Sequence, residues 1–244
     1  MNALLQILTQ PMEWMAFCRA AKSRGYSAMA HRRWFGKWSR STRAGASPIG
    51  DEQPWMTFAA AEFLRDWLRK DMSVFEWGSG GSTIFFAKHA GRVMAIEHEE
   101  AWAVQVRAAI GERQITNAEV EHLPPEPDAA ATAWDAGDPS VFPSGGDAFR
   151  GQSFQRYVTF IDQFPDASFH LVVVDGRSRP ACLQRGMAKV KPGGMLLLDN
   201  AERRHYQRAR ALLDPAQWEL HDFSGPGPYC AQFWQTIGWR RKSG

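Results

Sequence analysis

Three glycines in four positions, Gly78, Gly80 and Gly81, mark the part of the chain best suited to bind a ligand. The apolar run before them, residues 73–77, predicts a buried parallel strand, and the pattern from residue 81 onward predicts a helix. Glycines let the backbone bend sharply and approach a ligand without Cβ clashes. The first N–H groups of the helix favour a carboxylate or a phosphate. This stretch therefore predicts a nucleotide-type ligand loop between a strand and a helix.

The residues around this loop exclude two common nucleotide sites. Thr83 stands where a dinucleotide fingerprint needs its third glycine, and no Gly-Lys-Ser/Thr follows to make a P-loop. Glu76, two residues before the first glycine, would repel a pyrophosphate but can reach an ammonium or ribose hydroxyls. Residues 92–97 predict a second strand that ends in Glu97, and a carboxylate there suits a ribose diol. Both acids favour a ligand with a ribose over one with a bare pyrophosphate.

Two more predicted strands also end in acids. Residues 169–175 are the most strand-like run in the chain and end in Asp175, and residues 195–199 end in Asp199. In open parallel sheets, ligands bind beyond the carboxyl ends of the strands. Four carboxylates at one edge would repel each other unless a cation or another ligand joined them. The sequence therefore predicts one ligand site at this edge.

At these residues the sequence resembles the class I S-adenosylmethionine-dependent methyltransferases, in which acid-x-Gly-x-Gly-Gly is followed by an acid that closes the second strand. The resemblance covers about residues 54–238 and implies S-adenosylmethionine as the cofactor. His98 and Trp102 follow the second strand, where they could contact the adenine. The cofactor-binding residues that the resemblance implies are Glu76, Gly78, Ser79, Gly80, Ser82, Thr83, Glu97, His98 and Asp175.

A second resemblance concerns a metal. In the catechol and caffeoyl-CoA O-methyltransferases, an Asp after the fourth strand and an Asp-Asn after the fifth hold one magnesium, which implies that Asp175, Asp199 and Asn200 do so here, with Asp175 as the catalytic residue. Carboxylate and amide oxygens suit Mg²⁺, which would lower the pKa of a bound hydroxyl. The sequence departs from those enzymes at Ser178, which replaces their lysine base. The alternative is that Asp175 orients the cofactor or the acceptor, while Asp199 and Asn200 cap the next helix.

The alternation of predicted strands and helices indicates an α/β fold. Helices are expected over residues 54–68, with Trp55 on the apolar face, and over 99–110, 154–164, 179–190 and 203–213; further strands are expected over 118–123, 218–223 and 229–237. This order predicts a doubly wound, mostly parallel sheet with helices on both faces. The resemblance adds seven strands in the order 3-2-1-4-5-7-6. Residues 124–152 are rich in Pro, Ala, Gly and Asp and are the expected lid or insertion loop.

The composition is that of a globular protein of 244 residues with an asymmetric charge. Residues 1–50 contain eight lysines and arginines and one acid, a net charge of +7, so the rest of the chain carries −4 of the total of +3. The three cysteines form no Cys-x-x-Cys pair, which argues against a zinc site or a disulfide framework. Neither a membrane-spanning run nor a secretory signal is recognised, so a cytoplasmic location is expected.

The first 50 residues are expected to form a basic, helical N-terminal extension and linker before a methyltransferase domain over 51–244. Residues 31–38 alternate cations with aromatic side chains, and residues 41–51 resemble a linker. Such a segment could lie peripherally on an anionic membrane or touch nucleic acid. The alternative is a helical extension that caps the domain with a solvated basic face.

The function that the sequence favours is O-methylation of a small molecule rather than of nucleic acid, with S-adenosylmethionine as cofactor and Mg²⁺ as an optional one. Arginines near the expected mouth, Arg177, Arg179, Arg203 and Arg204, favour an anionic acceptor, and His205 or Tyr206 could act as a base. An aminopropyltransferase of the same fold is an alternative, although these arginines oppose a polyamine. A non-catalytic protein that binds a membrane or nucleic acid through its N-terminus is another. Thr83 disfavours a nicotinamide dehydrogenase.

Overall fold

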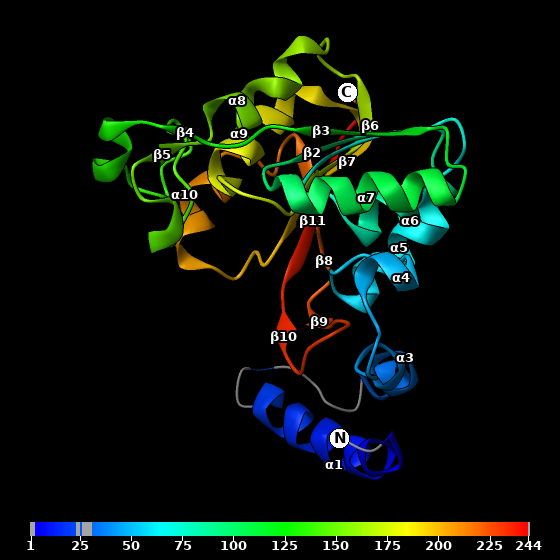
Figure 1. The fold of residues 1–244 in the computed structure, drawn as a ribbon. Helices are drawn as coiled ribbons and strands as arrows, with labels where there is room; N and C mark the ends of the chain where they lie inside the picture. The colour runs from blue at the N-terminus through cyan, green and yellow to red at the C-terminus, as the bar shows by residue number, and fades with distance from the viewer. Residues whose placement is uncertain (1–2, 23–24, 26–30, 244) are drawn as a thin grey trace.

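The computed structural model describes residues 3–22, 25 and 31–243, and its centre is a seven-stranded sheet (Figure 1). The strand order is β3-β2-β1-β6-β7-β11-β8, which is the predicted order 3-2-1-4-5-7-6. Five strands are parallel, and β11 is antiparallel to both of its neighbours. The strands are β1 (Ser73–Trp77), β2 (Arg92–Glu97), β3 (Ala118–His122), β6 (Phe169–Val174), β7 (Val190–Asp199), β8 (Trp218–Asp222) and β11 (Thr236–Arg241).

Helices cover both faces of the sheet. Successive side chains of a strand point to opposite faces, and in these strands both sets are apolar. Phe75 and Trp77 of β1 face a core with α8 (Gln155–Thr159), α9 (Arg179–Lys189) and α10 (Gln207–Arg210), whereas Val74 faces α5 (Phe58–Trp67) and α6 (Gly81–His89). Helix α7 (Glu100–Glu112) packs beside α6 against β2 and β3. The doubly wound α/β fold is therefore confirmed.

The C-terminal part of the chain differs from the prediction in two places. The prediction of one strand over 229–237 is wrong, because the last strand begins only at Thr236. Within the predicted range, β10 (Phe233–Trp234) pairs instead with β9 (Gly225–Pro226), away from the main sheet. The apolar side chains of β10 produce the pattern that resembles a strand of the sheet, but Phe233 packs on the N-terminal helices instead. The helix expected over 203–213 is limited to a short turn, η5 (Arg204–Tyr206), and to α10.

The N-terminal helices pack against the rest of the chain through aromatic side chains. In Figure 1, α1 (Ala3–Lys22) and α3 (Phe35–Ser41) lie at one end of the molecule, beside β9 and β10. Trp34 and Trp38 are buried, and Trp38 donates its indole N–H to the carbonyl of Cys230. Phe17 lies 4.5 Å from Phe233 between ring centroids. Because this cluster buries Trp34 and Trp38 and half-buries Phe35, the structure does not support the expected membrane contact through the rings of residues 31–38.

The remaining segments of irregular structure lie near the carboxyl edge of the sheet. Residues 48–51, expected within a linker, form the short helix α4 (Pro48–Asp51), which packs against α6. The long segment 124–152 contains β4 (Glu126–Pro127) and two 3₁₀ turns, η2 (Ala129–Ala133) and η3 (Asp147–Phe149), and leads into β5 (Gln152–Ser153). In the part of the chain that the structure describes, no helix is long and apolar enough to cross a membrane.

Candidate functional site

The glycine turn after β1 touches the turn after β6, so two strand ends meet backbone to backbone. Gly78 has a φ of +98°, which favours glycine, and a Cβ there would lie 3.0 Å from the backbone nitrogen of Gly176. A Cβ on Gly176 would in turn overlap the hydroxyl of Tyr157. The two turns therefore need small residues, and their glycines line a cavity at this end of the sheet.

Glu97 ends β2 and holds the glycine turn from the other side. Its carboxylate accepts hydrogen bonds from the Ser79 N–H at 3.1 Å, from the His98 N–H at 2.7 Å and from the Glu99 N–H at 3.0 Å. Its Oε1 also lies 2.6 Å from Nδ1 of His98. Burial opposes the charge, but the hydrogen bonds from His98, Glu99 and Ser79 outweigh it, so the pKa of Glu97 lies below its ordinary value. Glu97 is therefore a stable carboxylate at the edge of the turn.

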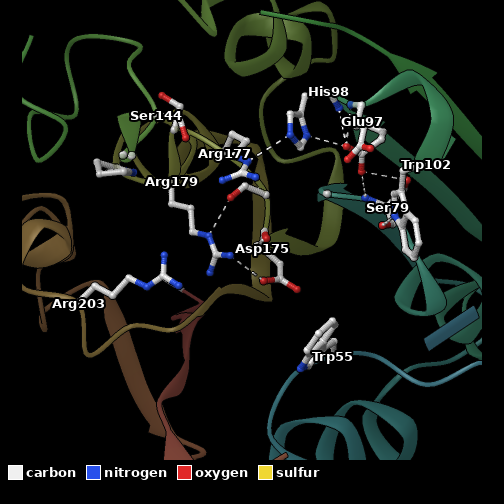
Figure 2. Close-up of a pocket in the computed structure, with 18 of the residues that line it drawn as sticks. Trp55, Ser79, Glu97, His98, Trp102, Ser144, Asp175, Arg177, Arg179 and Arg203 are labelled. Carbon is white, nitrogen blue, oxygen red and sulfur yellow. Dashed lines mark hydrogen bonds and ion pairs between the residues drawn. The ribbon is translucent and has the colours of Figure 1, made fainter. Parts of the chain in front are cut away.

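Two neighbours of Glu97 are fixed by further hydrogen bonds. Arg177 donates Nε–H to Nε2 of His98 at 3.2 Å, so the neutral ring carries its proton on Nδ1, toward Glu97. Trp102, from the first turns of α7, donates its indole N–H to the carbonyl of Ser79 at 2.7 Å. Figure 2 shows these side chains gathered at one side of the cavity. The turn, the end of β2 and the start of α7 thus form one preorganised wall.

Glu76 does not form part of this wall, although the sequence pattern predicted that it could reach the ligand. Glu76 is fully buried and accepts hydrogen bonds from the hydroxyls of Ser82 at 2.8 Å and Thr83 at 2.5 Å. Thr83 is buried as well and receives the N–H of Gly80. Burial raises the pKa of Glu76 to about 8, despite these hydrogen bonds. Glu76 therefore ties the end of β1 to the first turn of α6 as a neutral acid at pH 7.

Replacing Glu76 with Gln is expected to make stability less dependent on pH between about 4.5 and 8. The folded protein keeps this proton up to about pH 8, whereas the unfolded chain releases it near its ordinary pKa of 4.5. The free energy of unfolding of the wild type therefore falls through this window as the pH rises. Glu76→Gln lacks this titrating group, so its free energy of unfolding should fall by a few kcal/mol less over the same window. Urea unfolding at several pH values measures this. Glu13→Gln, at an exposed position of α1, is the control, and parallel profiles for the wild type and Glu76→Gln would contradict the prediction.

A cavity of about 570 Å³ opens above the two turns, within the size range of small-molecule sites. Seven of the residues predicted to bind a cofactor line it, namely Gly78, Ser79, Gly80, Ser82, Glu97, His98 and Asp175, whereas Glu76 and Thr83 do not. Residues 143–146 of the expected lid segment form part of the wall, as do His205 and Tyr206. The structure thus brings the ends of β1, β2 and β6 together at one cavity.

Trp55 lines the cavity although the sequence placed it on the buried face of a helix. Helix α5 begins at Phe58. Thr57 is its N-cap, and the Thr57 hydroxyl accepts a hydrogen bond from the N–H of Ala60. Trp55 therefore precedes the helix, is 50% exposed and stands across the cavity from Asp175 in Figure 2. Pro54 and the N-cap signal at Thr57 are the sequence features that would have separated Trp55 from the helix.

Arg179 joins the carboxyl ends of β6 and β7. Its Nε donates to the carbonyl of Gly176 at 2.9 Å, and Nη1 donates to the carbonyl of Asp199 at 2.6 Å and to Oδ1 of Asn200 at 3.1 Å. Its Nη2 donates to the carbonyl of Asp175 at 2.7 Å and forms an ion pair with the carboxylate of Asp175 at 3.1 Å. All five N–H donors of this buried guanidinium have partners. Arg179 therefore fixes the position of Asp175.

Asp199 does not line this cavity, and its carboxyl group is held by two other donors. Its Oδ1 accepts hydrogen bonds from the indole of Trp234 at 2.9 Å and from the hydroxyl of Thr236 at 2.5 Å, and the residue is 2% exposed. Burial, with the nearby charge of Asp175, raises the pKa of Asp199 to about 8. Asp199 therefore belongs to the contact between β7 and β11 and is mostly neutral at pH 7.

These contacts do not fit the magnesium site that the sequence suggested. Oδ1 of Asn200 accepts from Arg179 and Arg203, and the Arg179 guanidinium lies between Asp175, Asp199 and Asn200. A magnesium ion would need those oxygens, with Asp199 ionised, in near-ideal octahedral positions. Among the residues that the structure describes, no three His, Cys, Asp or Glu side chains are grouped to hold a metal. A guanidinium therefore takes the position expected for the metal.

A second hollow, of about 430 Å³, adjoins the first. It is lined by Asp199, Asn200, Cys230, Gln232 and Trp234, and it shares four residues with the first cavity: Trp55, Asp175, Arg179 and Arg203. Asp175 therefore stands where the two hollows meet. Such an arrangement can hold two ligands side by side, one against the glycine turn and one against β7 and β10.

No model of a known protein family matches the sequence, and no curated protein matches it. Among solved structures, the fold is similar to the O-methyltransferase TomG of Streptomyces achromogenes, involved in tomaymycin synthesis and solved with S-adenosylmethionine, with a TM-score of 0.56 and 14% identity over 85% of this chain and 95% of that one. It is also similar to an O-methyltransferase from Bacillus cereus, solved with S-adenosylhomocysteine. The TM-score is 0.55 and the identity 16%, over 84% of this chain and 86% of that one.

A third similar structure is a methyltransferase-like protein from Silicibacter pomeroyi, with a TM-score of 0.52 and 20% identity over 78% of this chain and 89% of that one. At such low identities, these similarities concern the fold, and the strand order agrees with them. The fold that the sequence resemblance implied is thereby confirmed. The chain has the fold of the class I S-adenosylmethionine-dependent methyltransferases.

Proposed function

We propose that this protein is a methyltransferase that binds S-adenosylmethionine and methylates an oxygen atom of a small molecule. The observation that carries the proposal is the ionised Glu97 at the end of β2, beside the glycine turn and inside a cavity of suitable size. A carboxylate in this place suits a ribose diol. Gly78 and Gly176 both line the cavity, and because neither has a side chain, a ligand can lie close to the backbone there.

The residues of the first cavity would hold the cofactor along the edge of the sheet. Glu97 would accept the ribose hydroxyls, and the turn at Gly78 and Gly80 would pack against the methionine part. His98 and Trp102 would lie beside the adenosine, since both flank Glu97. When bound, S-adenosylmethionine supplies a methyl group on a sulfonium, so that the O–C bond forms as the C–S bond breaks and its electron pair stays on sulfur.

The chain's contribution to the reaction would be alignment and removal of a proton. Asp175 stands between the two hollows, and Arg179 holds its Oδ1. Among the described residues, none donates a hydrogen bond to Oδ2, which would therefore be available to accept the proton of the acceptor hydroxyl. Alignment of the reacting atoms supplies much of the acceleration in such displacements. The acceptor would occupy the second hollow, between Trp55 and Trp234.

Two segments outside the sheet would assist binding. Residues 124–152 would act as a lid, since residues 143–146 line the cavity. Residues 1–50 would form an extension that packs on the methyltransferase domain, 51–244, through the cluster around Trp34 and Trp38. The arginines at the mouth disfavour the aminopropyltransferase alternative, because its polyamine substrate is cationic.

The first test is isothermal titration of the full chain with S-adenosylhomocysteine, and with NAD⁺ as the competing cofactor class. We expect one molecule of S-adenosylhomocysteine to bind per chain and NAD⁺ to give no heat. Binding should not require Mg²⁺, because the described residues offer the cofactor cavity no metal cluster. If folded protein, verified by circular dichroism, binds no S-adenosylhomocysteine, the proposed function is wrong.

A further inference from the structure

The rim between the two hollows carries more positive than negative charge. Arg179 and Arg203 line both hollows and Arg177 lines the first, and Figure 2 shows Arg179 and Arg203 extending toward the space beside Asp175. Arg179 is paired with Asp175. In the part of the chain that the structure describes, neither Arg177 nor Arg203 forms an ion pair with a carboxylate. Because Asp199 is mostly neutral at pH 7, Asp175 is the only described carboxylate of the second hollow that offsets these cations.

Two guanidinium groups converge on one neutral oxygen. Nη1 of Arg179 and Nη2 of Arg203 both donate to Oδ1 of Asn200, at 3.1 and 3.2 Å. Asn200 has a φ of +51°, a left-handed conformation that asparagine tolerates better than most residues. That turn places the amide at the end of β7, where it separates the two cations. Two like charges held so close favour an anion beside them.

Arg203 is the cation that can reach a ligand. The donors of Arg179 are all used, and Arg177 is held by His98 and lies over the Phe149 ring, 4.7 Å from its centroid. Arg203 donates one hydrogen bond to Asn200 and a longer one, 3.3 Å, to the hydroxyl of Tyr206, so it keeps N–H groups for another partner. Its side chain borders both hollows.

The second hollow also has an aromatic wall. Trp55 is half-exposed there, and its ring makes an edge contact with Tyr229 at 5.7 Å between centroids, which supports it from behind. Trp234 closes the inner end, where its indole N–H is already bonded to Asp199. An exposed indole face at a cavity favours flat ring systems. The hollow therefore combines a flat apolar surface with an unpaired cation.

We propose, on the basis of the proposed function, that the second hollow is the acceptor subsite and that it takes a flat, ring-bearing acceptor with a carboxylate or phosphate group bound by Arg203. The ring lies against Trp55, and the hydroxyl that receives the methyl group points to Asp175. Arg179, which stands where a metal was expected, replaces a divalent cation as the local positive charge. The acceptor is thus bound without a metal ion.

The test uses the full chain saturated with S-adenosylhomocysteine, in buffer with EDTA, and three probes in isothermal titration. The anionic probes are 4-hydroxybenzoate and phenyl phosphate, and the neutral one is 4-hydroxybenzyl alcohol. We expect an anion to bind at least about tenfold more tightly than the alcohol, since charge-assisted hydrogen bonds to a guanidinium are the strong ones. Whichever of the two anions binds more tightly indicates whether the acceptor carries a carboxylate or a phosphate group.

Arg203→Gln should remove this preference, and the adjacent Arg204→Gln should retain it. Arg204 is exposed and lines neither hollow, so it controls for a general loss of positive charge. Arg204→Gln should bind S-adenosylhomocysteine as the wild type does, and both variants are titrated with the probes at saturating S-adenosylhomocysteine. The proposal is overturned if the alcohol binds as tightly as the anions, if no anion binds, if Arg203→Gln keeps the preference or if binding requires Mg²⁺. Failure of S-adenosylhomocysteine itself to bind would instead reject the proposed function, and this proposal with it.

Discussion

Glu97→Gln is expected to weaken the binding of S-adenosylhomocysteine by at least about tenfold. Oε2 of the wild-type carboxylate holds the Ser79 hydroxyl only at 3.3 Å, so it would accept a ribose hydroxyl in its place, and a hydrogen bond to a charged group contributes about 1.5–3 kcal/mol. The amide carries no charge, and its NH₂ group cannot accept a hydrogen bond. It also faces the Ser79 N–H, which donates to Glu97 in the structure, so the glycine turn loses part of its support.

Isothermal titration of both proteins measures this effect, and Glu100→Gln is the matched control. Glu100 lies three residues further on, at the exposed start of α7, and does not line the cavity. The Glu100→Gln variant should bind S-adenosylhomocysteine with the same affinity as the wild type. A thermal melt of Glu97→Gln separates loss of binding from loss of folding. Equal affinities for the wild type and Glu97→Gln would show that the ribose does not lie at the end of β2.

Arg179→Ala is expected to lower the free energy of unfolding by about 3–5 kcal/mol and to abolish methyl transfer. Removing one partner of a buried ion pair leaves the other charge uncompensated, at a cost of this size. In this case the carboxylate of Asp175 loses its partner, and the carbonyls of Asp175, Gly176 and Asp199 lose their hydrogen bonds. The turns that follow β6 and β7 then lose the guanidinium group that links them.

Urea unfolding compares this variant with Arg185→Ala in the same helix. Arg185 is half-exposed and pairs with Asp162 at the surface at 3.3 Å, so its removal should cost less than about 1 kcal/mol. Arg179→Lys should be intermediate, because an ammonium group has three donors and lacks the planar fork that reaches five oxygens. If added Mg²⁺ restored transfer in Arg179→Ala, the two acids and Asn200 could hold a metal once the guanidinium is gone. Equal stability of the Arg179 and Arg185 variants would contradict the role assigned to Arg179.

The features that the sequence predicted correctly depend on short-range patterns. The run of apolar residues 73–77 and the glycines after it define a strand and a turn, because periodicity and conformational freedom are properties of neighbouring residues. The same is true of the strands that end in Glu97 and Asp175. Once the strand order is that of the class I fold, their carboxyl ends must meet at one edge of the sheet. The edge of the sheet at which the cavity lies therefore follows from the sequence pattern and the fold.

The direction in which each acid points could not be inferred in this way. Glu76 and Glu97 have similar sequence contexts, each at the end of a buried strand. Only the packing of α6 over β1 surrounds Glu76 with the hydroxyls of Ser82 and Thr83 and removes it from the cavity. Likewise, Asp199 turns toward Trp234, which lies 35 residues later in the chain. Side-chain environment is decided by such distant neighbours.

Two further features depend on distant neighbours and could not be predicted from the sequence. They are the burial of the rings in residues 31–38 and the presence of Arg179 at the expected metal position. The alternation of cations and tryptophans in that segment is compatible with a membrane surface. Only distant partners turn the tryptophans inward, namely Phe58 for Trp34 and Phe17 with the Cys230 carbonyl for Trp38. The sequence by itself thus determined the sheet, the glycine turn and the edge at which a ligand binds, because local periodicity encodes them. The tertiary structure alone decided that Arg179 stands among Asp175, Asp199 and Asn200, because that arrangement arises only when β6, β7 and α9 pack together.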